Sequence, residues 1–199
     1  MKKFTITLLI LIAAVAIYSF WPEKELKHSP GVLVPDDPVQ IAINSPVPWQ
    51  KGEYTITPLA EFRLKAFVLS TNSFSIGKES DLSPMDLALG WGQMSNQAIV
   101  DGLDISQSNR WYHWKAKVLI IPAREISTHS ANMHIIPANS TVEETLDKLY
   151  KGCIIELTGY LVSVRGKNGW HWESSLRRDD TGGGACELVW ADELKIINE

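Results

Sequence analysis

The chain has 199 residues and carries 19 lysines and arginines against 23 aspartates and glutamates, which gives a formal net charge of −4. A hydrophobic fraction of 45% excludes a wholly disordered chain, and the acidity argues against a general nucleic-acid binder, which requires a basic surface. Two cysteines are too few for a disulfide-dense mini-protein. The length fits one domain, with or without a membrane anchor.

The first 21 residues are expected to be a transmembrane anchor. The run from Phe4 to Trp21 contains no charged residue, and as a helix it would span about 27 Å, close to the hydrocarbon thickness of a bilayer. Lys2 and Lys3 precede it, so the positive-inside rule predicts a cytoplasmic N-terminus and an exported remainder. The alternative is a cleaved signal peptide, because Ala14-Val15-Ala16 matches a cleavage pattern. Both interpretations export the domain.

The exported part is expected to divide into a stalk and a folded domain. Residues 22–48 hold six of the ten prolines, and proline favours extended backbone, which predicts a semi-rigid stalk. A proline-rich docking peptide is the alternative. Residues 49–199 are predicted to form one β-rich globular domain. Outside residues 1–21 the chain has 17 basic against 23 acidic side chains, a charge of −6, which disfavours binding to an anionic membrane surface or to polyphosphate.

Hydrophobic periodicity and turn signals predict the elements of this domain in chain order. Strands are expected at residues 54–59, 61–70, 116–121, 153–164 and 185–190. Capping signals predict two short helices, at residues 83–89 and 141–150. The apolar phase of the fourth strand switches at Gly159, which predicts a bulge or bend, and Asn168-Gly169 predicts a hairpin turn.

Long bent strands with short helices between them are typical of one architecture. We expect a mainly β fold with a minor α component: a small, partly open β-barrel of the OB or SH3-like type, preceded by one transmembrane helix. A β-sandwich is the alternative.

Four segments of the sequence resemble a known family. They are LSPMDLALGWGQMS (82–95), ISQSNRWYHW (105–114), HSANMHIIPA (129–138) and GWHWESSLRRDDTGGGACELVW (169–190). Together they resemble a family of bacterial single-pass, membrane-anchored envelope proteins that has no assigned function. The resemblance implies an inner-membrane protein with its C-terminal domain in the periplasm, and it supplies no catalytic residues.

Cys153 and Cys186 are the two cysteines, and export to an oxidising compartment permits a disulfide between them. If Arg165 faces Trp170 across the predicted hairpin, Cys153 falls opposite residue 182. The glycine-rich loop that follows could absorb the remaining offset to Cys186. The alternative is two buried free thiols.

The same loop contains two further patterns. Asp180-Thr181-Gly182 matches the aspartic-protease triplet, but a polar stretch precedes it instead of an apolar strand, and no second triplet exists. The backbone N–H groups of the loop, flanked by Arg177 and Arg178, could instead bind an anion. A plain polar turn is the simplest interpretation.

The five histidines show no metal-ligand spacing, so no metal site or cofactor is expected. A hydrolase could still draw an acid–base site from separate parts of the chain. The candidate residues for such a site are His113, His129, His134, Asp179 and Asp180.

Eight tryptophans are the most unusual feature of the composition. Trp111 and Trp114, with Arg110 and His113 beside them, could form an aromatic platform for a sugar ring, a peptide or a partner protein. Filling of a small barrel core is the alternative role. With no catalytic motif present, we expect a non-enzymatic binding or envelope-assembly module whose partner is an envelope protein or a glycan. A glycan-binding module and an envelope hydrolase are the alternative functions.

Overall fold

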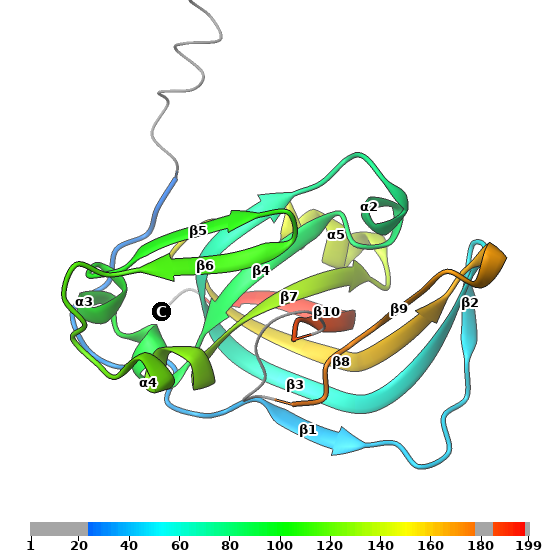
Figure 1. Cartoon of the computed structure of the whole chain (residues 1–199), viewed down its shortest axis with the longest axis horizontal. Coiled ribbons are helices and arrows are strands. Elements are labelled where there is room, and N and C mark those ends of the chain that lie inside the picture. The colour runs from blue at the N-terminus through cyan, green and yellow to red at the C-terminus, as the bar shows by residue number, and fades with distance from the viewer. Residues whose placement is uncertain (1–23, 178–184, 198–199) are drawn as a thin grey trace, which may run out of the picture.

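The computed structural model describes residues 24–177 and 185–197, and strands dominate it (Figure 1). The longest strand is β3 (Tyr54–Ser73), whose first half alternates between the core and the outer surface. Two strands were predicted here, at residues 54–59 and 61–70. They form one strand because a register shift between Pro58 and Ala60 bends the strand without ending it.

Five strands close a ring. β3 pairs with β4 (Met85–Gly90), β4 with β7 (Ser130–Pro137), and β7 with β10 (Glu187–Ile197). β10 then pairs with β8 (Ile154–Arg165), and β8 returns to β3. The β7–β10 pair is parallel and the other four pairs are antiparallel. The prediction of a mainly β fold is confirmed, and the ring closure favours a barrel over the alternative β-sandwich.

Shorter strands extend this ring. β1 (Val39–Ala42) and β2 (Trp49–Lys51) pair with β3, and β9 (His171–Glu173) pairs with β8. A separate hairpin of β5 (Asp104–Ser108) and β6 (Trp111–Lys115) lies over the barrel beside β4 and β7 (Figure 1). Successive cross-strand pairs of this hairpin alternate between its two faces: Ile105–Trp114 and Gln107–Tyr112 are partly buried, and the other three pairs are exposed.

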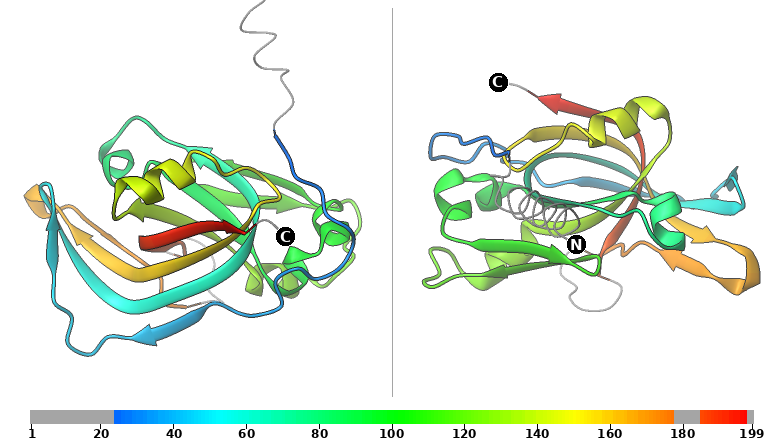
Figure 2. Two further views of the ribbon diagram at one scale, coloured as in Figure 1. Left: turned by 180° about the vertical axis from the view of Figure 1, so that it is seen from behind. Right: turned by 90° about the horizontal axis from the view of Figure 1, so that it is seen from above.

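The helices are short and lie outside the ring. They are α2 (Lys78–Leu82), α3 (Gln97–Val100), α4 (Ala123–Thr128) and α5 (Ser140–Leu146), with 3-10 turns η1 (Gly92–Ser95) and η2 (Lys167–Gly169). Figure 2 shows α5 lying beside β10, where it packs Val142 and Leu146 onto the core. The helix predicted at residues 141–150 is therefore present, although Asn139 rather than Thr141 caps it by accepting a hydrogen bond from the Val142 N–H.

The helix predicted at residues 83–89 is wrong, because Met85–Gly90 is strand β4. All six of its residues are buried, since β4 lies between two neighbours in the ring and is covered on both faces. Such a strand shows no alternation of polar and apolar residues. The Ser83-Pro84 pair that signalled a helix start instead follows α2 and leads into the strand.

The strand predicted at residues 116–121 is also wrong. This segment has no strand partner among the described residues and connects β6 to α4 through a series of bends. Its central side chains, Val118, Leu119 and Ile120, are exposed. An apolar run predicts burial, but this one faces solvent.

The predicted strand and hairpin at residues 153–170 are confirmed. β8 is continuous, and the predicted bend appears as register shifts in its two partners, between Pro58 and Ala60 in β3 and between Ala191 and Glu193 in β10. Gly159 lies opposite both strands near these shifts. The turn at Asn168-Gly169 has positive φ at both residues, 61° and 74°, a conformation that glycine and asparagine adopt more readily than other residues.

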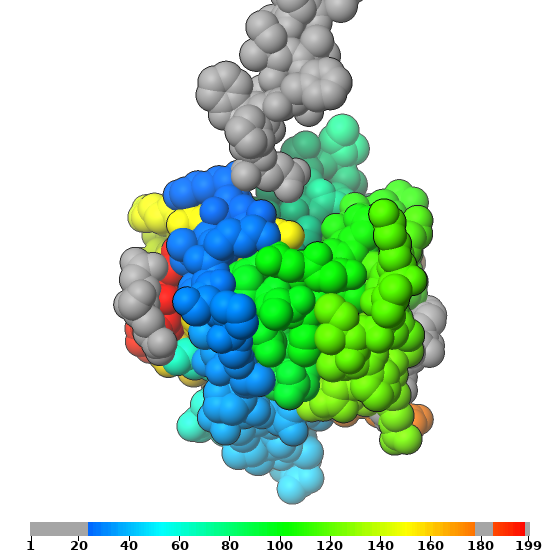
Figure 3. Space-filling view, turned by 90° about the vertical axis from the view of Figure 1, so that its left-hand side faces the viewer, coloured from blue at the N-terminus to red at the C-terminus, as the bar shows by residue number. Residues whose placement is uncertain are grey.

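The proline-rich segment, described from Lys24 onward, lies against the barrel. Val34 is fully buried and its N–H donates to the Ser95 hydroxyl at 2.9 Å, while β1 adds to the edge of β3. Figure 3 shows this blue segment lying along the green part of the chain that contains α3. Among residues 24–177 and 185–197, no helix is long and apolar enough to cross a bilayer. The anchor predicted at residues 1–21 lies outside the described residues.

Candidate functional site

A cleft of 480 Å³ opens at the end of the barrel where several connections meet. The segment after β3, the tip of the β5–β6 hairpin, β7, β9 and the chain just before β10 all contribute to it. Its walls combine aromatic, apolar and charged side chains. They are Phe74, Ile76, Glu79, Asn109, Arg110, Trp111, His134, Trp172, Glu173 and Cys186.

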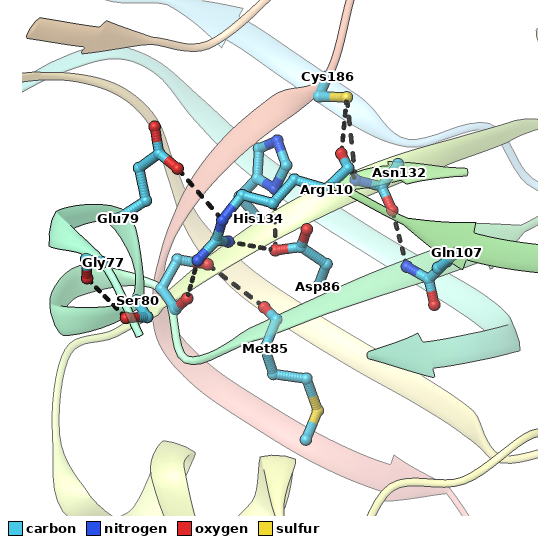
Figure 4. A network of polar contacts seen from close by, with 11 residues as sticks. Gly77, Glu79, Ser80, Met85, Asp86, Gln107, Arg110, Asn132, His134 and Cys186 are labelled. Atoms are coloured by element: carbon cyan, nitrogen blue, oxygen red, sulfur yellow. Dashed lines mark hydrogen bonds and ion pairs between the residues drawn. The ribbon is translucent and has the colours of Figure 1, made fainter. Parts of the chain in front are cut away.

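Arg110 is the central cation of the cleft and sits in the two-residue turn of the β5–β6 hairpin. Asn109 and Arg110 both have positive φ, 50° and 63°, a conformation that costs a non-glycine residue free energy. The turn directs the guanidinium toward β4, where Nη1 donates to Asp86 Oδ1 at 2.8 Å and Nη2 donates to the Ser83 carbonyl at 3.0 Å (Figure 4). These bonds hold the strained turn in place.

Two aromatic rings and a second carboxylate complete the surroundings of this guanidinium. Its central carbon lies 4.1 Å from the centre of the Phe74 ring and 5.4 Å from that of Trp172, which are cation–π distances. Glu79 Oε2 lies 3.5 Å from Arg110 Nε. The arginine is therefore fixed from several sides and only its edge is open to the cleft.

Asp86 and His134 form a buried pair beneath the arginine. The two residues are direct partners in the β4–β7 register, and His134 Nδ1 lies 2.9 Å from Asp86 Oδ1. Asp86 is fully buried, and its other oxygen has no hydrogen-bond partner among the described residues. A buried carboxylate is costly without a counter-charge, and the Arg110 guanidinium supplies one at 2.8 Å. The imidazole also packs on Trp172, with ring centres 4.8 Å apart.

A chain of amide contacts fastens the hairpin to the barrel. Gln107 Nε2 donates to Asn132 Oδ1 at 2.7 Å, and Asn132 Nδ2 donates to the Arg110 carbonyl at 3.1 Å. The Cys186 sulfur lies 3.8 Å from the same Asn132 nitrogen (Figure 4). The position of Arg110 is thereby set by its backbone as well as by its side chain.

The predicted aromatic platform is divided by the period of its strand. Trp111 and His113 face outward on β6, whereas Trp114 is partly buried and packs on the core. Only Arg110 and Trp111 of the predicted binding residues line the cleft, and Trp111 is 37% exposed. The indole that shares the cleft with Trp111 is Trp172, which comes from β9.

The three described histidines that were predicted for acid–base chemistry do not share one cleft. His134 lines it, but His113 is on the outer face of β6, and His129 ends α4 with its Nδ1 3.5 Å from Glu125. Asp179, Asp180 and Arg178 lie outside the described residues, and Arg177 is exposed at their edge. In the part of the chain that the structure describes, no group of three histidine, cysteine or acidic side chains could hold a metal ion.

The predicted disulfide is wrong for this structure, in which Cys153 and Cys186 form no bridge. Cys153 precedes Ile154, which pairs with Ile197 at the far end of β10, whereas Cys186 precedes the start of β10. The two sulfurs are separated by the length of that strand, while a bridge needs Cα atoms within about 7 Å. The expected register was close to correct in the β8–β9 hairpin, but β9 ends at Glu173 and the chain then leaves the ladder.

Burial of Tyr112, on the inner face of β6, raises the pKa of its phenol to about 12. The folded state therefore retains this proton at a pH where an unfolded chain, with a pKa near 10, releases it. We expect the free energy of unfolding to fall by about 2–3 kcal/mol between pH 10 and pH 12 because of this one group. Urea denaturation of the wild type and of Tyr112→Phe across this range measures the difference. Parallel pH curves for the two proteins would contradict it.

Several residues of the cleft were not predicted from the sequence. Asp86 lies within an apolar run and was not identified as a site residue. A single acidic residue in such a run is itself a signal of a buried polar site. Phe74 and Trp172 come from distant segments that only the fold brings together. Asn132 shows no local pattern.

Comparison of the chain with protein-family models, with curated proteins and with solved structures found no match. The function is therefore inferred from the geometry and chemistry of the cleft. Its defining features are the aromatic walls, the fixed guanidinium and the surrounding carboxylates.

Proposed function

We propose that the protein is an anchored binding module of the bacterial envelope that holds a glycan in the cleft beside Trp111 and Trp172. The predicted anchor at residues 1–21 places the domain on the periplasmic side of the inner membrane. The observation that carries the proposal is the cleft itself, where aromatic faces and hydrogen-bonding charges are fixed side by side. The likeness of four segments to an anchored envelope family supports the same location.

The order of the ring strands supports an OB-type barrel. In chain order the five ring strands are β3, β4, β7, β8 and β10, and we number them one to five. Around the ring their order is one, two, three, five, four, because β10 lies between β7 and β8. The third and fifth strands are the parallel pair, and α5 lies between the third and the fourth in the chain. OB-type barrels serve as scaffolds for oligosaccharide and oligonucleotide binding.

The chemistry of the cleft favours a sugar over other ligands. Glu79, Glu173 and Asp86 outnumber the single cation Arg110, which disfavours nucleic acid and other polyanions. The volume of 480 Å³ fits a compact ligand. Trp111 offers a partly exposed ring for the apolar face of a sugar, and the carboxylates offer acceptors for hydroxyl groups.

Three of the four segments that carry the family resemblance contribute residues to this cleft. They supply Arg110 and Trp111 from residues 105–114, His134 from residues 129–138, and Trp172 and Cys186 from residues 169–190. The overlap between the resembling segments and the cleft supports this site as the one that carries the proposed function.

Calorimetric titration of the detergent-solubilised full chain with soluble peptidoglycan fragments tests the proposal. We expect saturable binding that Trp111→Ala weakens about tenfold or more, because a partly exposed aromatic anchor contributes at least this much. Trp190→Phe is the matched control, since Trp190 packs on Trp49 away from the cleft, and it should change the affinity less than about twofold. The absence of binding to the wild type, or equal losses in both variants, would overturn the proposal.

The Asp86–His134 pair supports hydrolysis as a second candidate function. A buried carboxylate against Nδ1 leaves the opposite edge of the imidazole for the cleft, as in a general base with its orienting group. Chromatography of the peptidoglycan fragments after incubation separates the two functions. Cleaved products that His134→Gln abolishes would favour the hydrolase, and intact fragments favour binding alone.

A further inference from the structure

The segment between β6 and α4 presents an unusual apolar surface. Val118, Leu119 and Ile120 are 76%, 49% and 62% exposed, and they are the one run of three consecutive exposed large hydrophobic residues in the described part of the chain. Soluble surfaces rarely carry such runs without a partner, because each exposed side chain loses the free energy that burial would supply. We call residues 117–120 the apolar loop.

The apolar loop lies close to the point where the described chain begins. The Ile120 side chain is next to Gly102, and the neighbouring Asp101 forms an ion pair with Lys27. Lys27 is six residues after Trp21, the end of the charge-free run, and six residues reach at most about 20 Å. Figure 3 shows the N-terminal segment and the green region around α3 on the same face of the molecule. A bilayer entered at Trp21 is therefore within reach of the loop.

The charges around the loop suit the edge of a bilayer. Lys115 and Lys117 come just before the apolar residues and are exposed, so their long side chains can extend to the headgroups while Val118, Leu119 and Ile120 enter more deeply. Asp104 lies opposite Lys115 across the hairpin, and Asp101 is paired with Lys27. Because these acids offset much of the local positive charge, burial of apolar surface would drive the contact.

We infer that the apolar loop inserts into the lipid headgroup and acyl boundary of the membrane that the predicted anchor spans. This inference rests on the proposed anchor at residues 1–21 but not on the ligand of the cleft. The cleft lies at the opposite end of the β5–β6 hairpin, because Arg110 is in its turn and the apolar loop follows its last residue. The predicted anchor and the inserted apolar loop together hold the cleft on the side of the domain away from the bilayer.

Site-specific photocrosslinking of the full chain tests this contact. The chain carries p-benzoylphenylalanine in place of Leu119 and is reconstituted into vesicles of phosphatidylethanolamine and phosphatidylglycerol. Val47 is the matched control position, because it is 78% exposed and belongs to the connection between β1 and β2. Figure 1 shows this connection on the opposite side of the molecule from α3. We expect at least several-fold more lipid adduct, measured by mass spectrometry, at position 119 than at position 47.

Equal adduct yields at the two positions, or protein adducts in place of lipid adducts at position 119, would overturn the inference. Alkaline carbonate extraction of the same vesicles tests the predicted anchor separately from the loop contact. A chain that stays in the membrane without a lipid adduct at position 119 retains the anchor and refutes the loop contact. A chain that is extracted and gives no adduct refutes both. Serines at positions 118–120 should abolish adducts from a probe at Lys117 and leave thermal unfolding unchanged, because these side chains are exposed.

Discussion

Replacing Asp86 by alanine is expected to lower the free energy of unfolding by about 3–5 kcal/mol, one of the largest effects in this chain. Asp86 is fully buried and its Oδ1 accepts a hydrogen bond from Arg110 at 2.8 Å. Removal of the carboxylate leaves the guanidinium, whose side chain is only 13% exposed, without its closest counter-charge. Urea denaturation of the full chain in detergent, followed by tryptophan fluorescence, measures the loss.

The matched control for this prediction is an exposed ion pair. Glu193 lies 2.7 Å from Lys195 with both side chains largely in solvent, so Glu193→Ala should leave stability unchanged within error. The double variant Asp86→Leu with Arg110→Met should lower the free energy of unfolding by less than Asp86→Ala does, because it leaves no unpaired charge in the interior. If Asp86→Ala proves as mild as Glu193→Ala, the buried pair does not stabilise this part of the barrel.

The same residue shows why the candidate site was only partly predictable from the sequence. Arg110 and Trp111 stood out because they adjoin a dense aromatic cluster, and both line the cleft. Asp86 did not stand out, because it lies in a strand buried on both faces. Asp86 belongs to the site because the β4–β7 register places it opposite His134 and because the hairpin turn directs Arg110 toward it. Both partners are far away in the sequence, and local periodicity does not predict contacts of this kind.

The fold was predictable to a similar degree. Apolar and polar residues alternate along β3, and β8 is followed by an Asn-Gly turn. These local patterns predicted both strands to within a few residues of their ends. The segment at residues 116–121 was misassigned because hydrophobicity alone does not say whether a run faces the core or another apolar surface. The proline-rich segment was predicted to be a semi-rigid stalk, but its Val34 packs into the core of the domain and bonds to Ser95, 61 residues further along the chain.

Gly159→Val is expected to lower the free energy of unfolding by more than about 3 kcal/mol, because the added atoms collide with backbone rather than with a side chain that could move aside. A Cβ built at Gly159 would lie 1.9 Å from the Trp190 carbonyl oxygen and 3.1 Å from the Ala191 Cα. Gly159 is in register with Phe62 on one side and Ala191 on the other, so relief of the clash must separate strands of the closed ring. Thermal or urea unfolding of the variant measures the effect.

Gly52→Ala is the matched control, because it also loses a glycine but does so in open space. Nothing lies within 4 Å of a Cβ at Gly52, and only its φ of +58° opposes the substitution, which costs about 1 kcal/mol. The comparison separates close strand packing at Gly159 from the general conformational role of glycine. A Gly159→Val protein that unfolds at the wild-type urea concentration would mean that β8 and β10 are not packed as closely as the ring requires. The apolar phase switch at Gly159 would then reflect local sequence alone, without the strand contact that makes glycine necessary there.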